Sequence, residues 1–412
     1  MEWKEVRLGD VCEIYGRIGF RGYTTNDLVD TPKEGAISLS PKNIINGELN
    51  LDQCTYIKWD KYYESPEIMI NPNEIIITKT GSSVGRTTFV RRVVHPMTLN
   101  PQLVVLKNIS ENAEFLSYYI KSALFQSVLK SIVVGSAIPT LSQKNLANLI
   151  INVPKEVAYQ RRIASILSSL DRKIELNNKI NADLEEMAQA IFKNWFVDFE
   201  PFKDGKFVDS ELGMIPEGWK VGSIGDIVEF QNGFAFSSKD FSEYGEYKII
   251  TIKSVQDGCL LSEGSSKISE YPTKMPAYCK LQSGDILLSL TGNVGRCCLV
   301  TEPHLLLNQR VAKIKAKESF DNSFSYALFR LKETKELLIS ISRGTAQANL
   351  SPVEASKLPM VIPSKDARKK FSMFSDSIMD KIISIHIENR TLSTLRDTLL
   401  PRLMSGELEV PE

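Results

Sequence analysis

Two glycine-rich segments contain the residue types that bind phosphate groups, and they are the first candidates for chemistry in this chain. The first reads TKTGSSVGRTT (Thr78–Thr88) and the second SLTGNVGRCC (Ser289–Cys298). A nucleoside-triphosphate loop needs wider glycine spacing, a Lys, and a hydroxyl that binds magnesium. Both segments have shorter spacing and an Arg in place of that Lys. They fit a strand, a tight glycine turn and a second strand better, and the turn remains suited to another polyanion.

The glycine turn belongs to a much larger internal repeat. EWKEVRLGDVCEI from Glu2 is echoed by GWKVGSIGDIVEF from Gly218, and HPMTLNPQLVVLK from His95 by PHLLLNQRVAKIK from Pro303. The order of matching segments never changes, and small differences in length fall between them. The chain is therefore expected to contain two copies of one unit of roughly two hundred residues, too long a period for a solenoid.

Each copy closes with apolar residues at alternating steps of three and four, the pattern of a coiled-coil helix. The predicted helices span residues 155–197 and 366–404. The seam of the first is Ile163, Ile166, Leu170, Lys173, Asn177, Ile180, Leu184, Met187 and Ile191. The seam of the second is Phe371, Phe374, Ile378, Lys381, Ile385, Leu392, Leu395 and Leu399, with Glu388 in another polar slot. Polar seam residues fix partner and register at a cost in stability, and the simplest partner for each helix is the other.

These patterns predict a mixed α/β protein with a pseudo-two-fold internal duplication. Two globular domains, residues 1–154 and 218–365, are expected at opposite ends of an antiparallel two-helix coiled coil. Residues 198–217 form a linker and 405–412 a tail. The aromatic segment FKNWFVDFEPF (Phe192–Phe202) either packs against the second domain or binds a partner. Two similar heads at a fixed separation suit a linear, repetitive ligand, which favours duplex DNA.

Composition narrows the function classes. The 412 residues include 50 basic and 50 acidic residues, so any nucleic-acid-binding surface must be a local patch. No apolar run reaches the length of a membrane span, and the N-terminus is no signal peptide, so we expect a cytoplasmic protein. The six cysteines lack metal-ligand spacing and are expected to be free thiols. No catalytic constellation is evident.

Several further stretches are distinctive. The most telling is LDRKIELNNKINADLEEMAQAIFKNWFVDFEPF (Leu170–Phe202), which leads into SELGMIPEGWKVGSIGDI (Ser210–Ile227). With GFAFSSKDF (Gly233–Phe241), the two TG…VGR turns and the terminal LLPRLMSGELEV, the chain resembles the specificity (S) subunit of Type I restriction-modification systems over essentially its whole length. The resemblance implies two target-recognition domains, each of which reads one half of an asymmetric bipartite DNA sequence.

The same resemblance implies a prokaryotic, non-catalytic subunit without a cofactor of its own. Its helices would set the spacer between the half-sites and dock two modification (methyltransferase) subunits, which methylate adenine at N6. Restriction subunits would add ATP-dependent cleavage, so S-adenosylmethionine, ATP and magnesium would bind to the partner subunits. From the residues alone, a coiled-coil adaptor with two protein-binding heads and a phosphate-loop enzyme remain as alternatives.

DNA-binding candidates follow from side-chain chemistry, because Arg, Lys, Asn and Gln read base edges while Lys, Arg and hydroxyls hold phosphates. In the first head they are Arg17, Arg21, Lys42, Asn43, Lys79, Thr80, Gly81, Ser82, Ser83 and Arg86. In the second head they are Ser237, Ser238, Lys239, Lys253, Thr291, Gly292, Asn293, Arg296, Arg343, Thr345 and Gln347. For each residue the alternative is a solvated loop side chain. Turn residues shared by both heads cannot encode different targets, so we expect them to hold phosphates or shape the fold.

Overall fold

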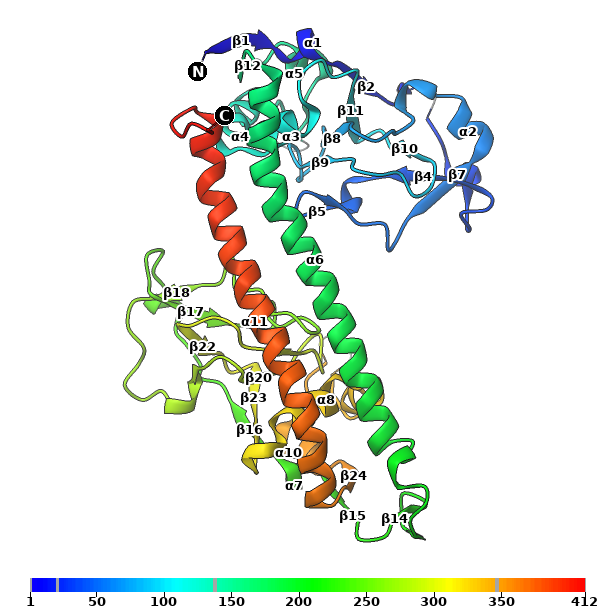
Figure 1. Cartoon of the computed structure of the whole chain (residues 1–412), viewed down its shortest axis with the longest axis vertical. Coiled ribbons are helices and arrows are strands. Elements are labelled where there is room, and N and C mark those ends of the chain that lie inside the picture. Colours follow the sequence, from blue (N-terminus) through cyan, green and yellow to red (C-terminus); the bar gives the residue numbers. More distant parts are fainter. Residues whose placement is uncertain (1, 20–21, 136–138, 345–347, 412) are drawn as a thin grey trace. The chain divides into compact units, whose positions relative to one another are not determined.

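The computed structural model describes residues 2–19, 22–135, 139–344 and 348–411. The chain divides into two compact units: unit 1 comprises Met1–Arg172 with Leu392–Glu412, and unit 2 comprises Lys173–Thr391. Two helices of 40 residues, α6 (Val157–Phe196) and α11 (Lys365–Met404), each contribute to both units. Each unit therefore consists of a globular head and one stretch of each long helix (Figure 1).

The described part of the first head contains two four-stranded sheets. Its strands are β1 (Trp3–Arg7), β2 (Glu13–Gly16), β3 (Leu28–Val29), β4 (Gly35–Leu39), β5 (Ile44–Ile45), β6 (Glu48–Leu49), β7 (Thr55–Lys58), β8 (Ile75–Thr78), β9 (Thr87–Phe89), β10 (Met97–Leu99), β11 (Leu103–Lys107) and β12 (Ile150–Pro154). The sheet β2-β11-β8-β9 is antiparallel throughout. The sheet β10-β4-β7-β3 contains one parallel pairing, between β10 and β4. A separate ladder joins β1 to β12.

In the residues described for it, the second head repeats most of this topology, and the two heads differ in one edge strand of the sheet that contains the parallel pair. Its strands are β13 (Phe207–Val208), β14 (Ile215–Pro216), β15 (Lys220–Ser223), β16 (Val228–Asn232), β17 (Tyr247–Ile250), β18 (Lys267–Ile268), β19 (Lys280–Leu281), β20 (Ile286–Ser289), β21 (Cys297–Leu299), β22 (Leu305–Leu307), β23 (Val311–Ala316) and β24 (Pro359–Ile362). The sheet β16-β23-β20-β21 corresponds to β2-β11-β8-β9, and β15 pairs with β24 as β1 does with β12. The parallel pair β17–β22 corresponds to β4–β10. The predicted duplication and mixed α/β fold are thus confirmed.

Short helices lie at equivalent places in the two heads, except α2, which has no counterpart among the helices described for the second head. In the first head they are α1 (Leu8–Val11), α2 (Trp59–Tyr63), α3 (Ala113–Lys121), α4 (Ala123–Ser131) and α5 (Gln143–Ala147). In the second they are α7 (Ile224–Ile227), α8 (Asn322–Arg330), α9 (Lys332–Ser340) and α10 (Pro352–Ser356). Serine hydroxyls cap the repeat-related helices α5 and α10: Ser142 Oγ accepts from Asn145 N at 3.0 Å, and Ser351 Oγ from Glu354 N at 3.4 Å.

The central strands are buried on both faces. Strand β8 reads IIIT and β20 reads ILLS, and every residue of both is buried. Continuous apolar runs of this kind are expected where both faces of a strand are covered. One face of the first sheet packs on α3, α4 and the start of α6, and the apolar ends of α11, Leu403 and Met404, complete that core. The glycine turns described below therefore lie at the ends of fully buried strands.

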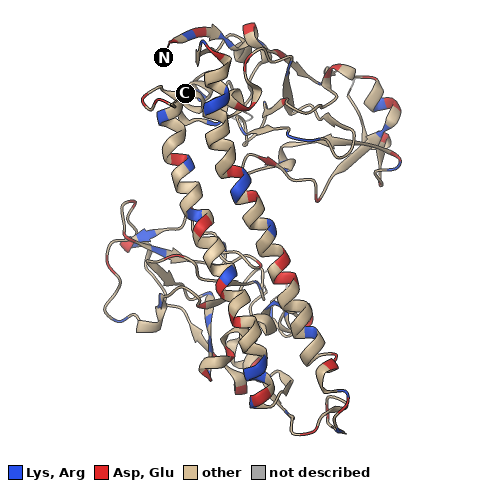
Figure 2. Cartoon of the chain, viewed as in Figure 1, with Lys and Arg blue, Asp and Glu red and all other residues tan. Residues whose placement is uncertain are grey.

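The two long helices run antiparallel within each unit. In unit 1, Arg396 Nη1 lies 2.8 Å from Asp171 Oδ1, and Val410 N donates to Tyr159 Oη at 3.0 Å. In unit 2, Asn177 Nδ2 donates to Asn389 Oδ1 at 2.8 Å. Basic and acidic residues are interspersed along both helices rather than separated into stripes (Figure 2). The antiparallel pairing that the heptads predicted is present in each unit.

The polar seam positions make contacts across the helix pair. Asn177 is 1% exposed, and its Nδ2 also donates to Glu388 Oε2 at 2.8 Å. Lys173 Nζ lies 3.4 Å from Glu388 Oε1. The hydrogen bond from Asn177, followed by the charge of Lys173, lowers the pKa of the Glu388 carboxyl. These contacts fix one register of α6 against α11.

Four residues expected in the seam are exposed. Met187, Phe374 and Leu395 are 46%, 59% and 45% exposed, and Lys381 is exposed as well. Ile163, Phe371 and Ile385 are buried, and the remaining predicted apolar seam residues, Ile166, Leu170, Ile180, Leu184, Ile191, Ile378, Leu392 and Leu399, are half-buried. The departure has a physical cause: each helix also packs on a head, so its buried face is broader than a two-position seam and includes Leu167 and Ile382.

The aromatic segment at the end of α6 packs into the second head, as one of the two sequence interpretations predicted. Phe192 and Phe196 are buried against Phe324 and Phe371, with ring centroids 5.0–5.7 Å apart, for example 5.2 Å for Phe192–Phe324. Phe202 reaches Trp219 at 4.9 Å. Within the described ranges, none of the helices combines the length and apolar character needed to cross a membrane.

Candidate nucleic-acid interface

The first glycine turn connects β8 to β9, as the strand–turn–strand interpretation predicted. Thr78 N donates to Arg86 O at 2.8 Å and Gly85 N to Thr78 O at 2.9 Å, which closes the turn. Gly81 and Gly85 have φ of +102° and +88°, which glycine adopts without the strain that a side chain would add. The turn thus presents Thr80 to Arg86 at the end of a buried strand.

The second glycine turn, between β20 and β21, has the same construction. Ser289 N donates to Arg296 O at 2.9 Å and Gly295 N to Ser289 O at 3.0 Å. Gly292 and Gly295 have φ of +73° and +81°. One missing residue between the glycines is absorbed within the turn, and both ends keep the same hydrogen bonds.

Each glycine turn is tied to the same two neighbouring segments. In the first head, Lys79 N donates to Gln102 O at 2.8 Å and Gly81 N to Pro139 O at 2.9 Å. In the second head, Leu290 N donates to Arg310 O at 3.1 Å and Gly292 N to Ala348 O at 2.8 Å. We call the glycine turn and the two segments tied to it the loop cluster. In head 1 it comprises residues 79–86, 100–102, 134–135 and 139–140, and in head 2 residues 290–296, 308–310, 343–344 and 348–349. The last two ranges in each head are the described parts of one segment.

The hydrogen bonds exclude one way of binding phosphate. All four glycine N–H groups of the two turns, at positions 81, 85, 292 and 295, already donate to carbonyls of their own head. A phosphate loop needs such groups free and pointing at the ligand. The N–H groups of these glycines are therefore not available to a phosphate, in agreement with the sequence interpretation that this is no nucleotide site.

The loop cluster carries positive charge and no negative charge. The segments of head 1 contain Lys79 and Arg86, those of head 2 contain Arg296, Arg310 and Arg343, and neither set contains an Asp or Glu. Such a patch stands out in a chain whose total charge is zero. Burial lowers the pKa of the Lys79 ammonium, and an anion beside it would offset that desolvation. The cluster is therefore electrostatically suited to a polyanion.

Several predicted residues are exposed and available to a ligand. Ser82 and Arg86 are exposed on the first turn, Gly292 and Asn293 on the second, and Arg343 at the base of the adjoining hairpin; Thr80, Gly81 and Ser83 are half-buried. Lys42, Ser237, Ser238, Lys239 and Lys253 are exposed on other loops of the heads. Lys253 connects to the second turn through Gln256, whose Nε2 donates to Lys253 O at 2.9 Å and whose Oε1 accepts from Arg296.

Three other predicted residues serve the fold instead. Arg17 is 4% exposed, and its Nε donates to Leu99 O at 2.8 Å. Asn43 is also 4% exposed, and its Oδ1 accepts from Ser40 N at 2.9 Å in a capping box. Thr291 is 6% exposed, with Oγ1 donating to Asn349 Oδ1 at 2.9 Å. Burial and internal hydrogen bonds leave these side chains little to offer DNA. Arg21, Thr345 and Gln347 lie outside the described residues.

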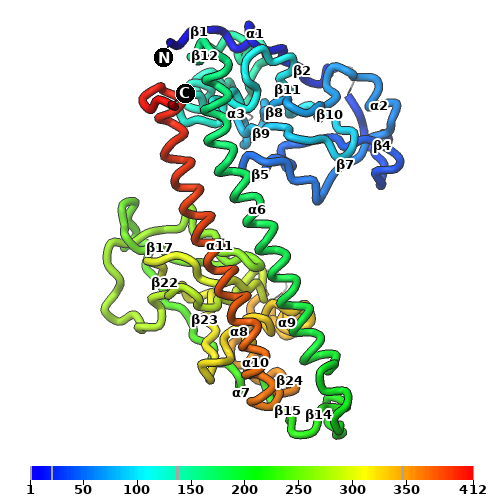
Figure 3. The backbone as a smooth tube through the Cα atoms, viewed as in Figure 1, coloured from blue at the N-terminus to red at the C-terminus, as the bar shows by residue number. Residues whose placement is uncertain are grey.

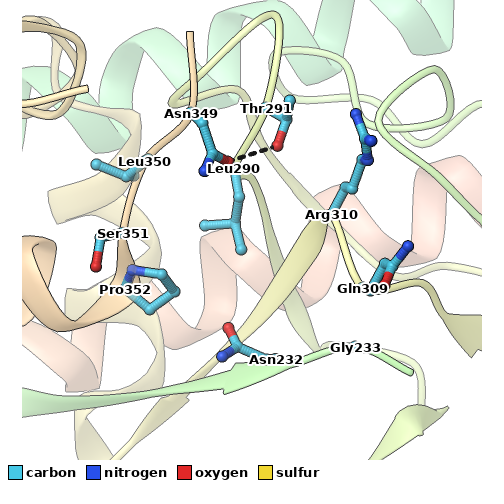
Figure 4. A pocket seen from close by; sticks show the side chains of 10 residues that line it. All are labelled: Asn232, Gly233, Leu290, Thr291, Gln309, Arg310, Asn349, Leu350, Ser351 and Pro352. Atoms are coloured by element: carbon cyan, nitrogen blue, oxygen red, sulfur yellow. Dashed lines mark hydrogen bonds between the residues drawn. The ribbon is translucent and has the colours of Figure 1, made fainter. Parts of the chain in front are cut away.

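A polar hollow of about 730 Å³ lies between the loop cluster of the second head, the end of β16 and the start of α10. Figure 4 shows Thr291 and Asn349 joined by their hydrogen bond on one side, with Gln309 and Arg310 on another and Asn232 below. Sequence patterns did not single out Gln309, Arg310 or Asn349. Their place in the repeat could have identified two of them, because Asn308–Arg310 repeats Asn100–Gln102 and the two copies differ at both residues after the Asn.

Comparison with known proteins places this architecture in one family. The family described as the Type I restriction modification DNA specificity domain matches residues 1–186 and 216–395. The chain is 27% identical over 420 residues to the Type I restriction enzyme MjaIX specificity subunit of Methanocaldococcus jannaschii, covering 100% of this chain and 94% of the relative. It is 24% identical to the HindI specificity subunit of Haemophilus influenzae, covering 99% and 100% of the two chains.

A solved structure has the same fold. The crystal structure of the S subunit of a Type I restriction-modification system from M. genitalium superimposes with a TM-score of 0.55 at 16% identity, over 98% of this chain and 96% of that chain. Both matched segments carry a glycine turn, the segments tied to it and a stretch of long helix. Fold, duplication and sequence agree, and the chain belongs to the Type I restriction-modification DNA specificity family.

Proposed function

We propose that this chain is the DNA-reading subunit of a Type I restriction-modification complex. Each head binds one half of an asymmetric bipartite sequence in duplex DNA through its loop cluster. One observation supports this most directly: two heads with the same backbone hydrogen bonds display different, acid-free sets of side chains. A shared scaffold gives both heads the same orientation to DNA, and different side chains give each head its own base preference.

The electrostatics suit duplex DNA. Exposed Arg86 and Arg343 provide cations for phosphates, while Ser82 and Asn293 provide uncharged polar groups at the same turns. Phosphate contacts fix position and carry no sequence information, so the side chains that differ between the heads must do the reading. Because two heads stand in one chain, the target has two unequal halves.

The remaining parts of the complex complete the proposal. The chain performs no chemistry itself; two modification subunits dock on it and methylate adenine, and restriction subunits cleave DNA. S-adenosylmethionine, ATP and magnesium bind to those partners, and the complex acts in the cytoplasm. Helices α6 and α11 contribute to both units, and we propose that their length sets the number of base pairs between the half-sites.

The test is to co-express the chain with its modification subunit and map adenine methylation across a genome by single-molecule sequencing. We expect one asymmetric bipartite motif. Replacing residues 1–154 by those of a relative with another motif should change one half only, and replacing residues 218–365 should change the other half. Methylation without a defined motif, or a motif that does not depend on this chain, would instead favour an adaptor with protein-binding heads.

A further inference from the structure

A three-residue turn in the loop cluster has the same backbone in both heads. Asn100 N donates to Leu39 O at 2.8 Å, and Asn308 N donates to Ile250 O at 3.1 Å. Each Asn side chain then accepts from the backbone two residues on: Gln102 N at 2.9 Å and Arg310 N at 3.4 Å. This is an Asx turn, in which the Asn side chain takes the place of a backbone acceptor.

The last residue of the turn is fixed on both sides. Its carbonyl accepts from the glycine turn, from Lys79 N in the first head and Leu290 N in the second. The next residue donates back to the Asn carbonyl, Leu103 N at 3.2 Å and Val311 N at 2.9 Å. The Cα atoms of Gln102 and Arg310 are therefore held in equivalent positions, and only their side chains differ.

The side chain of Arg310 is exposed and available to a ligand. Among the residues that the structure describes, its guanidinium has no hydrogen-bond or ion-pair partner, whereas Arg296 of the neighbouring turn is bound to Gln256. The hollow beside it contains Thr291, Gln309 and Asn349 and no carboxylate (Figure 4). In the first head, Gln102 is exposed at the equivalent place, with Oε1 accepting from Asn100 Nδ2 at 3.2 Å.

We propose that the last residue of this turn reads a base in each head, with Arg310 reading a guanine in the half-site of the second head. Gln102 reads an adenine in the other half-site. Arg pairs with both O6 and N7 of guanine, and Gln with N6 and N7 of adenine, in the major groove. A fixed backbone reduces the conformational entropy lost when such a side chain binds. The inference rests on the proposed function and names one residue in each head that determines its sequence specificity.

The first test compares methylation motifs of complexes assembled with the wild-type chain, Arg310→Gln and Gln102→Ala. Arg310→Gln should change a single guanine position in the second head's half-site and leave the other half unaltered. Gln102→Ala should relax one adenine position in the first head's half-site alone. Lys315→Gln, which removes an exposed cation from β23 outside the loop cluster, should leave the whole motif unchanged.

A binding measurement identifies the base atom that Arg310 contacts. It can also be made with a variant whose complex no longer methylates DNA. Duplexes in which one guanine at a time carries 7-deazaguanine lack the N7 acceptor. At one position this change should weaken binding by the wild-type complex roughly 5- to 150-fold. It should have no effect on a complex containing Arg310→Ala, because the contact is already absent.

Two results would overturn the assignment. If Arg310→Gln lowers methylation of every site equally without changing the motif, Arg310 holds a phosphate and reads no base. If 7-deazaguanine weakens wild-type and Arg310→Ala complexes equally at every position, another residue reads the guanine. Failure of the proposed function is recognised separately, because the wild-type complex itself would then produce no bipartite motif.

Discussion

At the residue scale, Gly81 and Gly85 occupy one turn but have different surroundings. Both have positive φ. In the parts of the chain that the structure describes, a Cβ on Gly81 would meet only Gln102 Nε2, at 3.8 Å, whereas a Cβ on Gly85 would lie 2.8 Å from Gln126 Oε1 and 3.0 Å from Leu129 Cδ2. Gln126 cannot move freely, because its Nε2 donates to Ile120 O at 2.8 Å and to Gly85 O at 3.1 Å.

These surroundings separate backbone strain from side-chain collision. Gly81→Ala should destabilise unit 1 by about 1–2 kcal/mol through the left-handed backbone alone. Gly85→Ala should cost at least about 1 kcal/mol more, since a hydrogen bond of Gln126 must break. Hydrogen exchange of β8 and β9 peptides at increasing urea concentration would measure both losses. Equal losses would mean that Gln126 and Leu129 adjust without cost.

The sequence predicted the turns but not the side chains that they leave available. Repetition and glycine spacing were enough to predict a strand–turn–strand at both sites. Arg17 and Asn43 were predicted to contact DNA from their side-chain chemistry alone, yet both are buried. An Arg or Asn side chain can equally well form hydrogen bonds with backbone groups inside a head. Arg310 ends the short turn after the apolar strand β22, and its exposure follows from the folded structure and from no sequence pattern.

At the element scale, two asparagines four residues apart on α6 have opposite environments. Asn177 makes hydrogen bonds to Glu388 and Asn389 across the helix pair. Asn181 is 6% exposed, and within the described part of the chain neither its Nδ2 nor its Oδ1 has a partner. A buried amide without partners destabilises the fold, whereas one with good partners specifies the register.

Replacement of each asparagine by leucine tests this difference. Asn181→Leu should stabilise unit 2 by about 1–2 kcal/mol, because an unpaired buried amide is removed. Asn177→Leu should destabilise it by a similar amount, about 1–2 kcal/mol, because Asn389 Oδ1 and Glu388 Oε2 lose their amide donor. Urea unfolding monitored by hydrogen exchange of α6 and α11 peptides gives both values. Stabilisation by both substitutions would show that the seam hydrogen bonds contribute no net free energy.

The heptad pattern predicted the existence and pairing of the helices better than their buried faces. Steps of three and four identify a two-helix seam, and Ile163, Phe371 and Ile385 are indeed buried. The pattern contains no information on the heads, which cover a second face of each helix. Met379 and Ile382 are buried for that reason, and Phe374 stays largely exposed, with its ring against Trp195 of α6.

At the scale of the whole molecule, the C-terminal segment belongs to the first head. Leu403 and Met404 are 1% exposed in the core of unit 1, and Leu408 and Val410 pack against it. Gly406 lies against Trp3, so closely that a Cβ there would be 2.8 Å from the indole Nε1. The two ends of the chain thus lie side by side in unit 1 (Figure 3).

Removal of residues 405–412 should therefore destabilise unit 1 selectively. We expect a loss of about 2–3 kcal/mol, from the partial burial of two aliphatic side chains and the hydrogen bond of Val410 N to Tyr159. Hydrogen exchange of peptides from β8 and β11 should accelerate, while peptides from β20 and β23 keep their protection. Equal acceleration in both units would show that the tail stabilises the chain by a different route.

The same arrangement has a consequence for biosynthesis. Unit 2 is one continuous stretch, Lys173–Thr391, and all of it leaves the ribosome before Leu392–Glu412 do. Unit 1 needs Leu392–Glu412 for its core, so its synthesis begins first but its folding can finish only after the whole of unit 2 has been synthesised. This reverses the usual N-terminal-first order of multidomain proteins. A chain released early would therefore carry a complete second head and an unfinished first one.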